Sequence, residues 1–117
     1  MRHLFIINDA PYGSERTYNA MRLANALAKA GAGDRVTVFL MADSVLAAKR
    51  GQATPEGFYN LERMLSRLAA QGGEILLCGT CLAARGIADG ELIEGARRST
   101  IDALAQATRS ADKVLVF

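Results

Sequence analysis

The sequence predicts an α/β fold, a three-layer sandwich with a mainly parallel sheet, flavodoxin-like in outline. Apolar runs of strand length alternate with longer segments of helical periodicity, a pattern typical of parallel strands joined by helical crossovers. The strand-like runs are apolar on both faces, as expected where helices cover both sides of a sheet. Half of the 117 residues are hydrophobic, and this length suits one domain over residues 1–117.

Two strands and one helix are predicted in the first part of the chain. Residues 2–8 and 35–41 are the strands, because both are short apolar runs that contain β-branched side chains. The helix begins after the turn residues 8–13, where Ser14 can cap it, and it ends at Gly31. Its apolar residues keep helical spacing: Ala20, Leu23, Ala24, Leu27 and Ala30.

The remaining predicted elements follow in the same alternating order. In sequence they are a short helical turn, a long helix, a strand, an irregular segment, a capped helix and a strand: residues 44–50, 58–68, 74–78, 79–98, 99–108 and 113–117. The apolar stripe of the long helix starts at Phe58, and the last helix is capped by Ser99 or Thr100. Within the irregular segment, a short helix is expected after Cys81 and another around Leu92.

Composition and charge exclude several classes of protein. Fourteen basic and twelve acidic residues leave a net charge of +2 without a basic block, which disfavours a nucleic-acid or membrane-surface binder. No apolar run approaches the roughly 20 residues that span a bilayer, and Asn8 and Asp9 stop the N-terminal run too early for a secretory signal. We therefore expect a cytoplasmic protein without a cofactor. Its many alanines predict a thin core, which favours a homo-oligomer.

The candidate site follows the third strand, because ligands of parallel sheets bind outside the carboxyl ends of the strands. There the chain reads Cys78-Gly79-Thr80-Cys81, followed by Arg85. Free backbone N–H groups, the start of a short helix and Arg85 would each stabilise a thiolate. A thiolate can attack a sulfur atom or carry one as a persulfide. Gly79 lets the backbone approach a bound group closely, and Thr80 lies between the two cysteines.

Other interpretations of the two cysteines remain open. Cysteine is among the most buried residue types, so Cys78 also fits a plain core position. A Cys-x-x-Cys pair can be a dithiol redox couple, although that motif usually opens a long helix. A structural zinc site needs four ligands, and one chain offers only Cys78, Cys81 and His3. We therefore expect no metal, and we expect His3 to be structural.

The loop after the first strand is a second, weaker candidate. Residues 11–16 resemble a phosphate-cradling turn, but they lack the glycines and lysine of a P-loop. A capped turn is the simpler interpretation. A functional loop would use Tyr12, Gly13 and Ser14, with Tyr12 over the thiol pocket. The pair Arg97-Arg98 is expected to be a solvated or interface pair.

Four segments together resemble the DsrE/DsrF family of sulfur-relay proteins, and its YchN-like branch most closely. They are Ala10–Glu15, Phe39–Asp43, Cys78–Cys81 with Arg85–Ile87, and Ser110–Leu115. The resemblance implies an α/β fold and a ring-like homo-oligomer, either a trimer or a hexamer of two trimers. It also implies a cysteine at the position of Cys78 that accepts sulfane sulfur from a donor protein and passes it to an acceptor protein. In the YchN-like branch, Cys81 also has a counterpart.

Two functions of different class follow. The first is a sulfur carrier or sulfurtransferase, in which Cys78 becomes a persulfide and Cys81 acts as a resolving thiol. The second is a non-catalytic homo-oligomeric scaffold or small-molecule binder with a structural Cys78 at a subunit interface. A flavin-binding module is a distant third.

Overall fold

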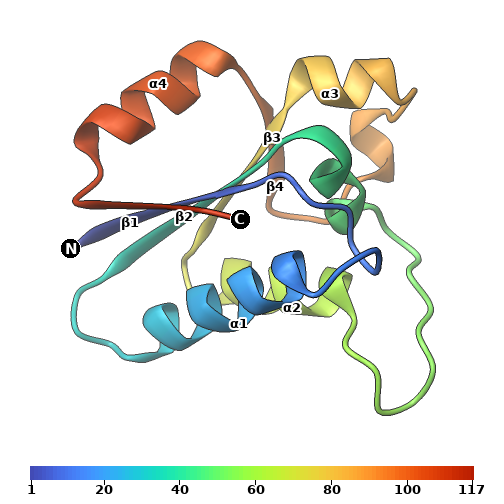
Figure 1. Ribbon diagram of the computed structural model, residues 1–117, viewed down its shortest axis with the longest axis horizontal. Coiled ribbons are helices and arrows are strands. Elements are labelled where there is room, and N and C mark those ends of the chain that lie inside the picture. The colour runs from blue at the N-terminus through green and yellow to red at the C-terminus, as the bar shows by residue number, and fades with distance from the viewer.

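The sheet of the computed structural model, which describes residues 1–117, contains five parallel strands (Figure 1). The strands are β1 (Arg2–Ile7), β2 (Arg35–Leu40), β3 (Glu74–Cys78), β4 (Ala96–Ser99) and β5 (Lys113–Val116), in the spatial order β4-β3-β2-β1-β5. Every neighbouring pair is parallel, so the carboxyl ends of all strands lie at the same edge of the sheet. The predicted parallel α/β sandwich is confirmed.

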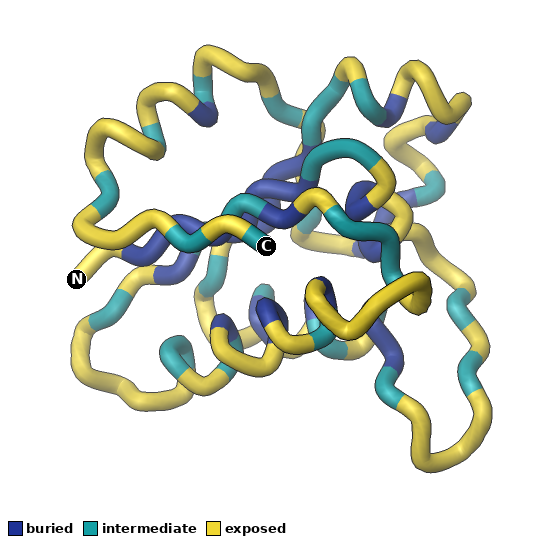
Figure 2. Tube along the Cα trace, viewed as in Figure 1, coloured by how far each residue is buried: buried dark blue, intermediate teal, exposed yellow.

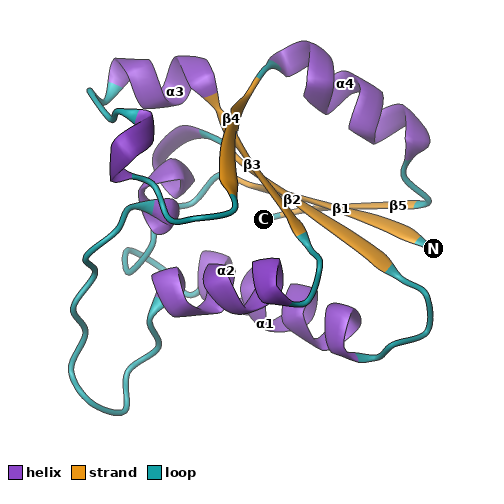
Figure 3. Ribbon diagram, turned by 180° about the vertical axis from the view of Figure 1, so that it is seen from behind, coloured by secondary structure: helices purple, strands orange, loops and turns teal.

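Helices lie on both faces of this sheet (Figure 3). The helix α1 (Arg16–Lys29) and the helix α2 (Leu61–Ala70) cover one face, and α4 (Ile101–Ser110) covers the other. A short helix, α3 (Gly79–Ala84), follows β3 directly at the carboxyl edge. Two 3₁₀ turns complete the chain, η1 (Ala42–Ala48) after β2 and η2 (Asp89–Glu91) before β4. None of the helices has the length and apolar character needed to cross a bilayer.

The larger core lies beneath α1 and α2. Alternate strand residues such as Phe5, Val38 and Leu77 point into it and are fully buried. The two helices are also tied to each other, because the side-chain amide of Asn25 donates to the carbonyls of Met21 at 3.0 Å and Met64 at 3.1 Å. This layer therefore holds the sheet in one defined packing arrangement.

The face beneath α4 has a much smaller core. It consists of four buried residues, Leu4, Phe39, Leu76 and Leu104. Figure 2 shows that most of α4 is exposed. Thr100 caps this helix by accepting a hydrogen bond from the N–H of Ala103 at 3.1 Å. Near the carboxyl edge, the side chains of Ile6, Met41 and Cys78 pack against this cluster but are only partly buried.

Three elements differ from the sequence-based predictions. Residues 96–99 form the edge strand β4, which was not predicted because its sequence is short and polar. The helix α3 starts at Gly79 and not after Cys81. The helix α2 starts only at Leu61, because Asn60 has an extended backbone and accepts a hydrogen bond from the N–H of Arg63 as the N-cap. Phe58 therefore lies outside the helix and is 68% exposed.

Candidate functional site

Cys78 lies where strand β3 turns into helix α3. Its Sγ accepts a hydrogen bond from the N–H of Cys81 at 3.3 Å, so the thiol side chain caps the helix that follows it. The next residue must be small, because a Cβ on Gly79 would lie 3.1 Å from the carbonyl oxygen of Ser99 and 3.2 Å from Cγ of Arg98. The glycine thus lets the β3–α3 turn pass close to β4 and places Cys78 at the edge of the sheet.

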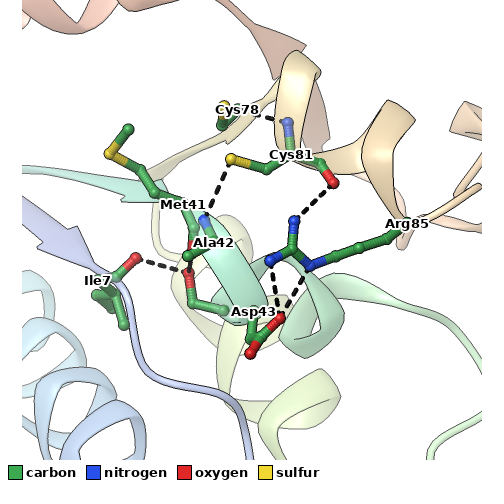
Figure 4. Close-up of polar contacts among 8 residues, drawn as sticks. Ile7, Met41, Ala42, Asp43, Cys78, Cys81 and Arg85 are labelled. Atoms are coloured by element: carbon green, nitrogen blue, oxygen red, sulfur yellow. Dashed lines mark hydrogen bonds and ion pairs between the residues drawn. The ribbon is translucent and has the colours of Figure 1, made fainter.

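Cys81 meets a different part of the chain. Its Sγ accepts a hydrogen bond from the N–H of Ala42 at 3.2 Å, at the start of η1 (Figure 4). Ala42 has a φ of 50°, a left-handed conformation that costs a residue with a Cβ about 1–2 kcal/mol. The loop after β2 is therefore held against the second thiol in a strained conformation.

The guanidinium of Arg85 lies between Cys81 of α3 and Asp43 of η1 and joins these two segments (Figure 4). Its Nε and Nη2 lie 2.9 Å and 2.8 Å from Oδ1 of Asp43, and its Nη1 donates to the carbonyl oxygen of Cys81 at 3.0 Å. The expected folding of Arg85 over the cysteine loop thus brings its guanidinium to Asp43 and Cys81, with no hydrogen bond to Cys78. Its charge is matched by a carboxylate rather than left free for a thiolate.

Burial raises the pKa of the Cys81 thiol above its ordinary value, and the neighbouring Cys78 thiol raises it further. The N–H of Ala42 and the charge of Arg85 act in the opposite direction but do not reverse the shift. Cys81 is therefore a protonated thiol at neutral pH. The Cys81 S–H can donate a hydrogen bond to a sulfur atom bound at Cys78, or can transfer its proton to that atom.

A cavity of about 510 Å³ opens beside Cys78. Its wall comes from the start of α3 and from the β4–α4 turn: Cys78, Gly79, Thr80, Arg98, Ser99, Thr100 and Ile101. Thr80, which lies between the two cysteines in the sequence, is thus part of the cavity wall. The hydroxyl groups of this wall can donate to a bound sulfur species.

Sequence reasoning missed the role of Arg98. Its Nε donates to Asp89 at 2.8 Å, and its Nη1 and Nη2 donate to the carbonyls of Gly79 at 2.9 Å and Ile87 at 3.3 Å. The side chain therefore fastens β4 to both ends of the α3 segment. No signal in the sequence could reveal this, because β4 itself was not predicted.

The Tyr12 loop lies apart from the cavity. The Tyr12 hydroxyl donates to the Gln52 side chain and accepts from the N–H of Leu61 at 3.1 Å. Ser14 Oγ donates to the Asp9 carboxylate at 2.7 Å and accepts from the N–H of Arg16 at 3.3 Å. Neither these residues nor Gly13 line the cavity. Tyr12 joins this loop to the start of α2. The predicted Ser14 cap is wrong, because Glu15 is the N-cap residue of α1 and no side chain caps that helix.

The potential metal ligands do not gather either. His3 lies at the amino end of β1, where its Nε2 is 3.0 Å from the Asp34 carboxylate. The two cysteines lie at the opposite edge of the sheet, and no group of three His, Cys, Asp or Glu side chains comes together.

Comparisons with known proteins agree with this fold. The family model described as the DsrE/DsrF-like family matches residues 1–117. The chain is 46% identical to protein YchN of Escherichia coli over 114 residues, which cover 97% of both chains. It is 36% identical to the uncharacterized protein MJ0989 of Methanocaldococcus jannaschii over 118 residues, which cover both chains completely.

Solved structures show the same similarity. The crystal structure of the E. coli YchN protein superimposes with a TM-score of 0.92 at 47% identity, covering 100% of both chains. The protein of unknown function MTH1491 from Methanobacterium thermoautotrophicum shares the fold, with a TM-score of 0.82 at 18% identity over 99% of this chain and 98% of its own.

Proposed function

The chain belongs to the DsrE/DsrF-like family, and on that premise we propose that it is a sulfur carrier that holds sulfane sulfur as a persulfide on Cys78. One observation carries the proposal. The Cys78 sulfur borders a cavity and accepts the N–H of Cys81, while a second, protonated thiol lies three residues further along. A plain core cysteine would have neither the cavity nor the N–H donor.

In the transfer step, the Cys78 thiolate attacks the outer sulfur of a donor persulfide. The new S–S bond forms as the S–S bond of the donor breaks, and the electron pair leaves with the donor thiolate. The N–H of Cys81 and the wall hydroxyl of Thr80 supply hydrogen bonds to the sulfur atoms during this exchange. An acceptor thiolate then attacks the outer sulfur and releases Cys78.

Cys81 provides a second outcome when no acceptor arrives. After the Cys81 thiol loses its proton to water, the thiolate attacks the inner sulfur of the Cys78 persulfide. Hydrosulfide leaves with the electron pair of the broken S–S bond, and a Cys78–Cys81 disulfide remains. Because the Cys81 thiol is protonated at neutral pH, this release is slower than transfer to an ionised acceptor thiol. The raised pKa thus protects the carried sulfur.

The test is mass spectrometry of the intact protein after incubation with a persulfide donor. We expect the wild type and Cys81→Ser to gain the mass of one sulfur atom, and Cys78→Ser to gain none. In Cys81→Ser the adduct should also persist longer, because the resolving thiol is missing. An unchanged adduct in Cys78→Ser would contradict the proposal. If no variant gains sulfur, a structural role for Cys78 is the better account.

We further propose that the carrier is a homo-oligomer, with a second copy covering the carboxyl edge of the α4 face. Side chains there are apolar yet remain exposed: Val114 is 42%, Ile101 64% and Val116 65% exposed. Val116 stands beside the half-buried Ile6 in register on β1, and Ile6 packs against the same small cluster as Cys78. Contiguous exposed apolar surface is typical of interaction sites.

Light scattering on a sizing column tests the oligomer. Val116→Asp should lower the mass toward that of the 12.5 kDa single chain, because it places a charge in the covered apolar surface. Ala26→Asp, on the exposed side of α1, adds the same charge to the other face and should leave the mass unchanged. A wild type that elutes as a single chain would contradict this second proposal without touching the first.

A further inference from the structure

A second cleft, of about 520 Å³, lies at the amino edge of the sheet. Figure 1 shows that α4 runs from the carboxyl edge back toward the chain's N-terminus, and the cleft lies between its last turns and the first residues of the strands. The polar side chains that line it are those of Arg2, His3, Arg35, Thr37, Glu74, Gln106 and Ser110. Cys78 lies at the opposite end of the sheet, so the cleft is separate from the sulfur site.

Two arginines face each other in this cleft. Arg2 of β1 and Arg35 of β2 are register partners on adjacent parallel strands, and both line the cleft. Register partners on adjacent strands have their side chains on the same face of the sheet. Because neighbouring strands lie about 4.8 Å apart, these two side chains start close together. Like charges placed directly opposite each other destabilise a sheet. Neither guanidinium forms an ion pair or side-chain hydrogen bond within the chain, so no direct contact offsets this repulsion.

The carboxylates nearby are already engaged. Within the cleft, Glu74 binds Nη2 of Arg97 at 2.6 Å and Oγ1 of Thr37 at 3.3 Å. Outside it, Asp34 binds Nε2 of His3 at 3.0 Å and Asp112 accepts the main-chain N–H of Arg2 at 2.7 Å.

None of these carboxylates contacts the guanidinium of Arg2 or Arg35, so both guanidinium groups remain available to a ligand in the cleft. Gln106 adds a side-chain amide that makes no hydrogen bond within the chain and can donate to an acceptor.

We propose that this cleft binds a small, doubly charged oxyanion of the phosphate or sulfate class, free or as the phosphoryl end of a metabolite. Guanidinium groups bind such oxyanions with two parallel hydrogen bonds each. The cleft volume lies in the range of small-molecule sites, which span about 300–1,000 Å³. A bound dianion neutralises Arg2 and Arg35 together and removes their repulsion.

Calorimetric titration with inorganic phosphate, sulfate and chloride at constant ionic strength tests the proposal. Phosphate should bind the wild type saturably, and Arg2→Gln/Arg35→Gln should weaken that binding at least tenfold. The control Lys29→Gln/Arg63→Gln also removes two positive charges, from α1 and α2, and should bind phosphate like the wild type. Weaker sulfate than phosphate binding would point to a phosphoryl ligand, and equal binding to the oxyanion class as a whole.

Thermal unfolding gives a second readout that does not depend on the affinity range. Phosphate should raise the midpoint of the wild type and of the control, but not that of Arg2→Gln/Arg35→Gln. In chloride alone, Arg35→Gln should unfold at the same temperature as the wild type or higher, because it removes the repulsion. The proposal is overturned if the double arginine variant binds phosphate as tightly as the wild type. Absence of saturable phosphate binding to the wild type at millimolar concentration overturns it equally.

Discussion

The face of the sheet beneath α1 and α2 contributes to a cluster of 20 buried apolar residues, whereas the face beneath α4 has a cluster of four. Two helices with buried side chains close the first face, and one largely exposed helix crosses the second (Figure 2). The difference separates two tasks. Burial of apolar area, which stabilises the fold, is concentrated on one face, and the other keeps surface available for ligands and partners.

The two cysteines divide between these faces. Cys81 packs against the large cluster, and Cys78 packs against the small one. The roles that we propose for them rest on that placement, because burial raises the pKa of the Cys81 thiol and Cys78 borders an open cavity. A pair that is only three residues apart in sequence thus samples two different environments.

Truncation of one leucine on each face is the largest expected effect. Leu65→Ala, at a fully buried position on α2, should lower the free energy of unfolding by about 3–4 kcal/mol. Leu104→Ala, at a 7% exposed position on α4, should cost about 2 kcal/mol, because its small cluster can relax toward solvent. Urea denaturation at one fixed protein concentration measures both. Equal losses would mean that the two faces contribute alike to stability.

The helix caps offer a milder version of the same comparison. Asn60→Ala should destabilise by about 2 kcal/mol, because Asn60 caps α2 and its buried side chain also donates to the carbonyl of Gln52 at 3.2 Å. Thr100→Ala removes only the cap of α4, which is exposed, and should cost about 1 kcal/mol. Thermal unfolding of both variants measures which substitution destabilises the protein more. A larger destabilisation by Thr100→Ala than by Asn60→Ala would contradict this prediction.

The smallest expected difference between the two faces is in the alkylation rates of the two thiols in the native wild type. At neutral pH, iodoacetamide should modify Cys78 severalfold faster than Cys81, as mapped by peptide mass spectrometry, because Cys78 lines the open cavity and the pKa of the Cys81 thiol is raised. Because only the thiolate reacts, the rate at Cys81 should still be rising with pH at the ordinary thiol pKa of 9.0 and should level off only above it. A Cys81 that reacts as fast as Cys78 at neutral pH would contradict the division between the faces.

The raised pKa of Cys81 also predicts how the free energy of unfolding changes at alkaline pH. Folding raises the pKa of Cys81, so the folded state retains the proton more strongly than the unfolded state does. This contribution is fully present below pH 9.0 and is lost as the pH rises through the raised value in the folded protein. In Cys81→Ser, the fall in stability at alkaline pH should be smaller than in the wild type.

Much of the fold was predictable because its signals are local. Strands β1, β2 and β3 are apolar on both faces, and turn residues follow the first of them. Strand β4 was not predictable, because an edge strand with Arg97 and Arg98 has no apolar alternation. The position of Cys78 followed from the rule that parallel sheets bind ligands at their carboxyl edge. The partner of Arg85 did not follow, because Asp43 lies 42 residues earlier in the chain.

The sequence alone determined the alternation of strands and helices and the placement of a thiol at a strand end, because both depend on neighbours a few residues apart. Only the tertiary structure decided which groups meet that thiol and its partner. Three such contacts arise from strand register and crossover geometry. They are the hydrogen bond from the N–H of Ala42 to Cys81, the hydrogen bond from Arg98 to Gly79 of α3, and the pairing of Arg2 with Arg35. Such contacts join residues far apart in sequence, so they form only when the sheet brings distant segments to one edge.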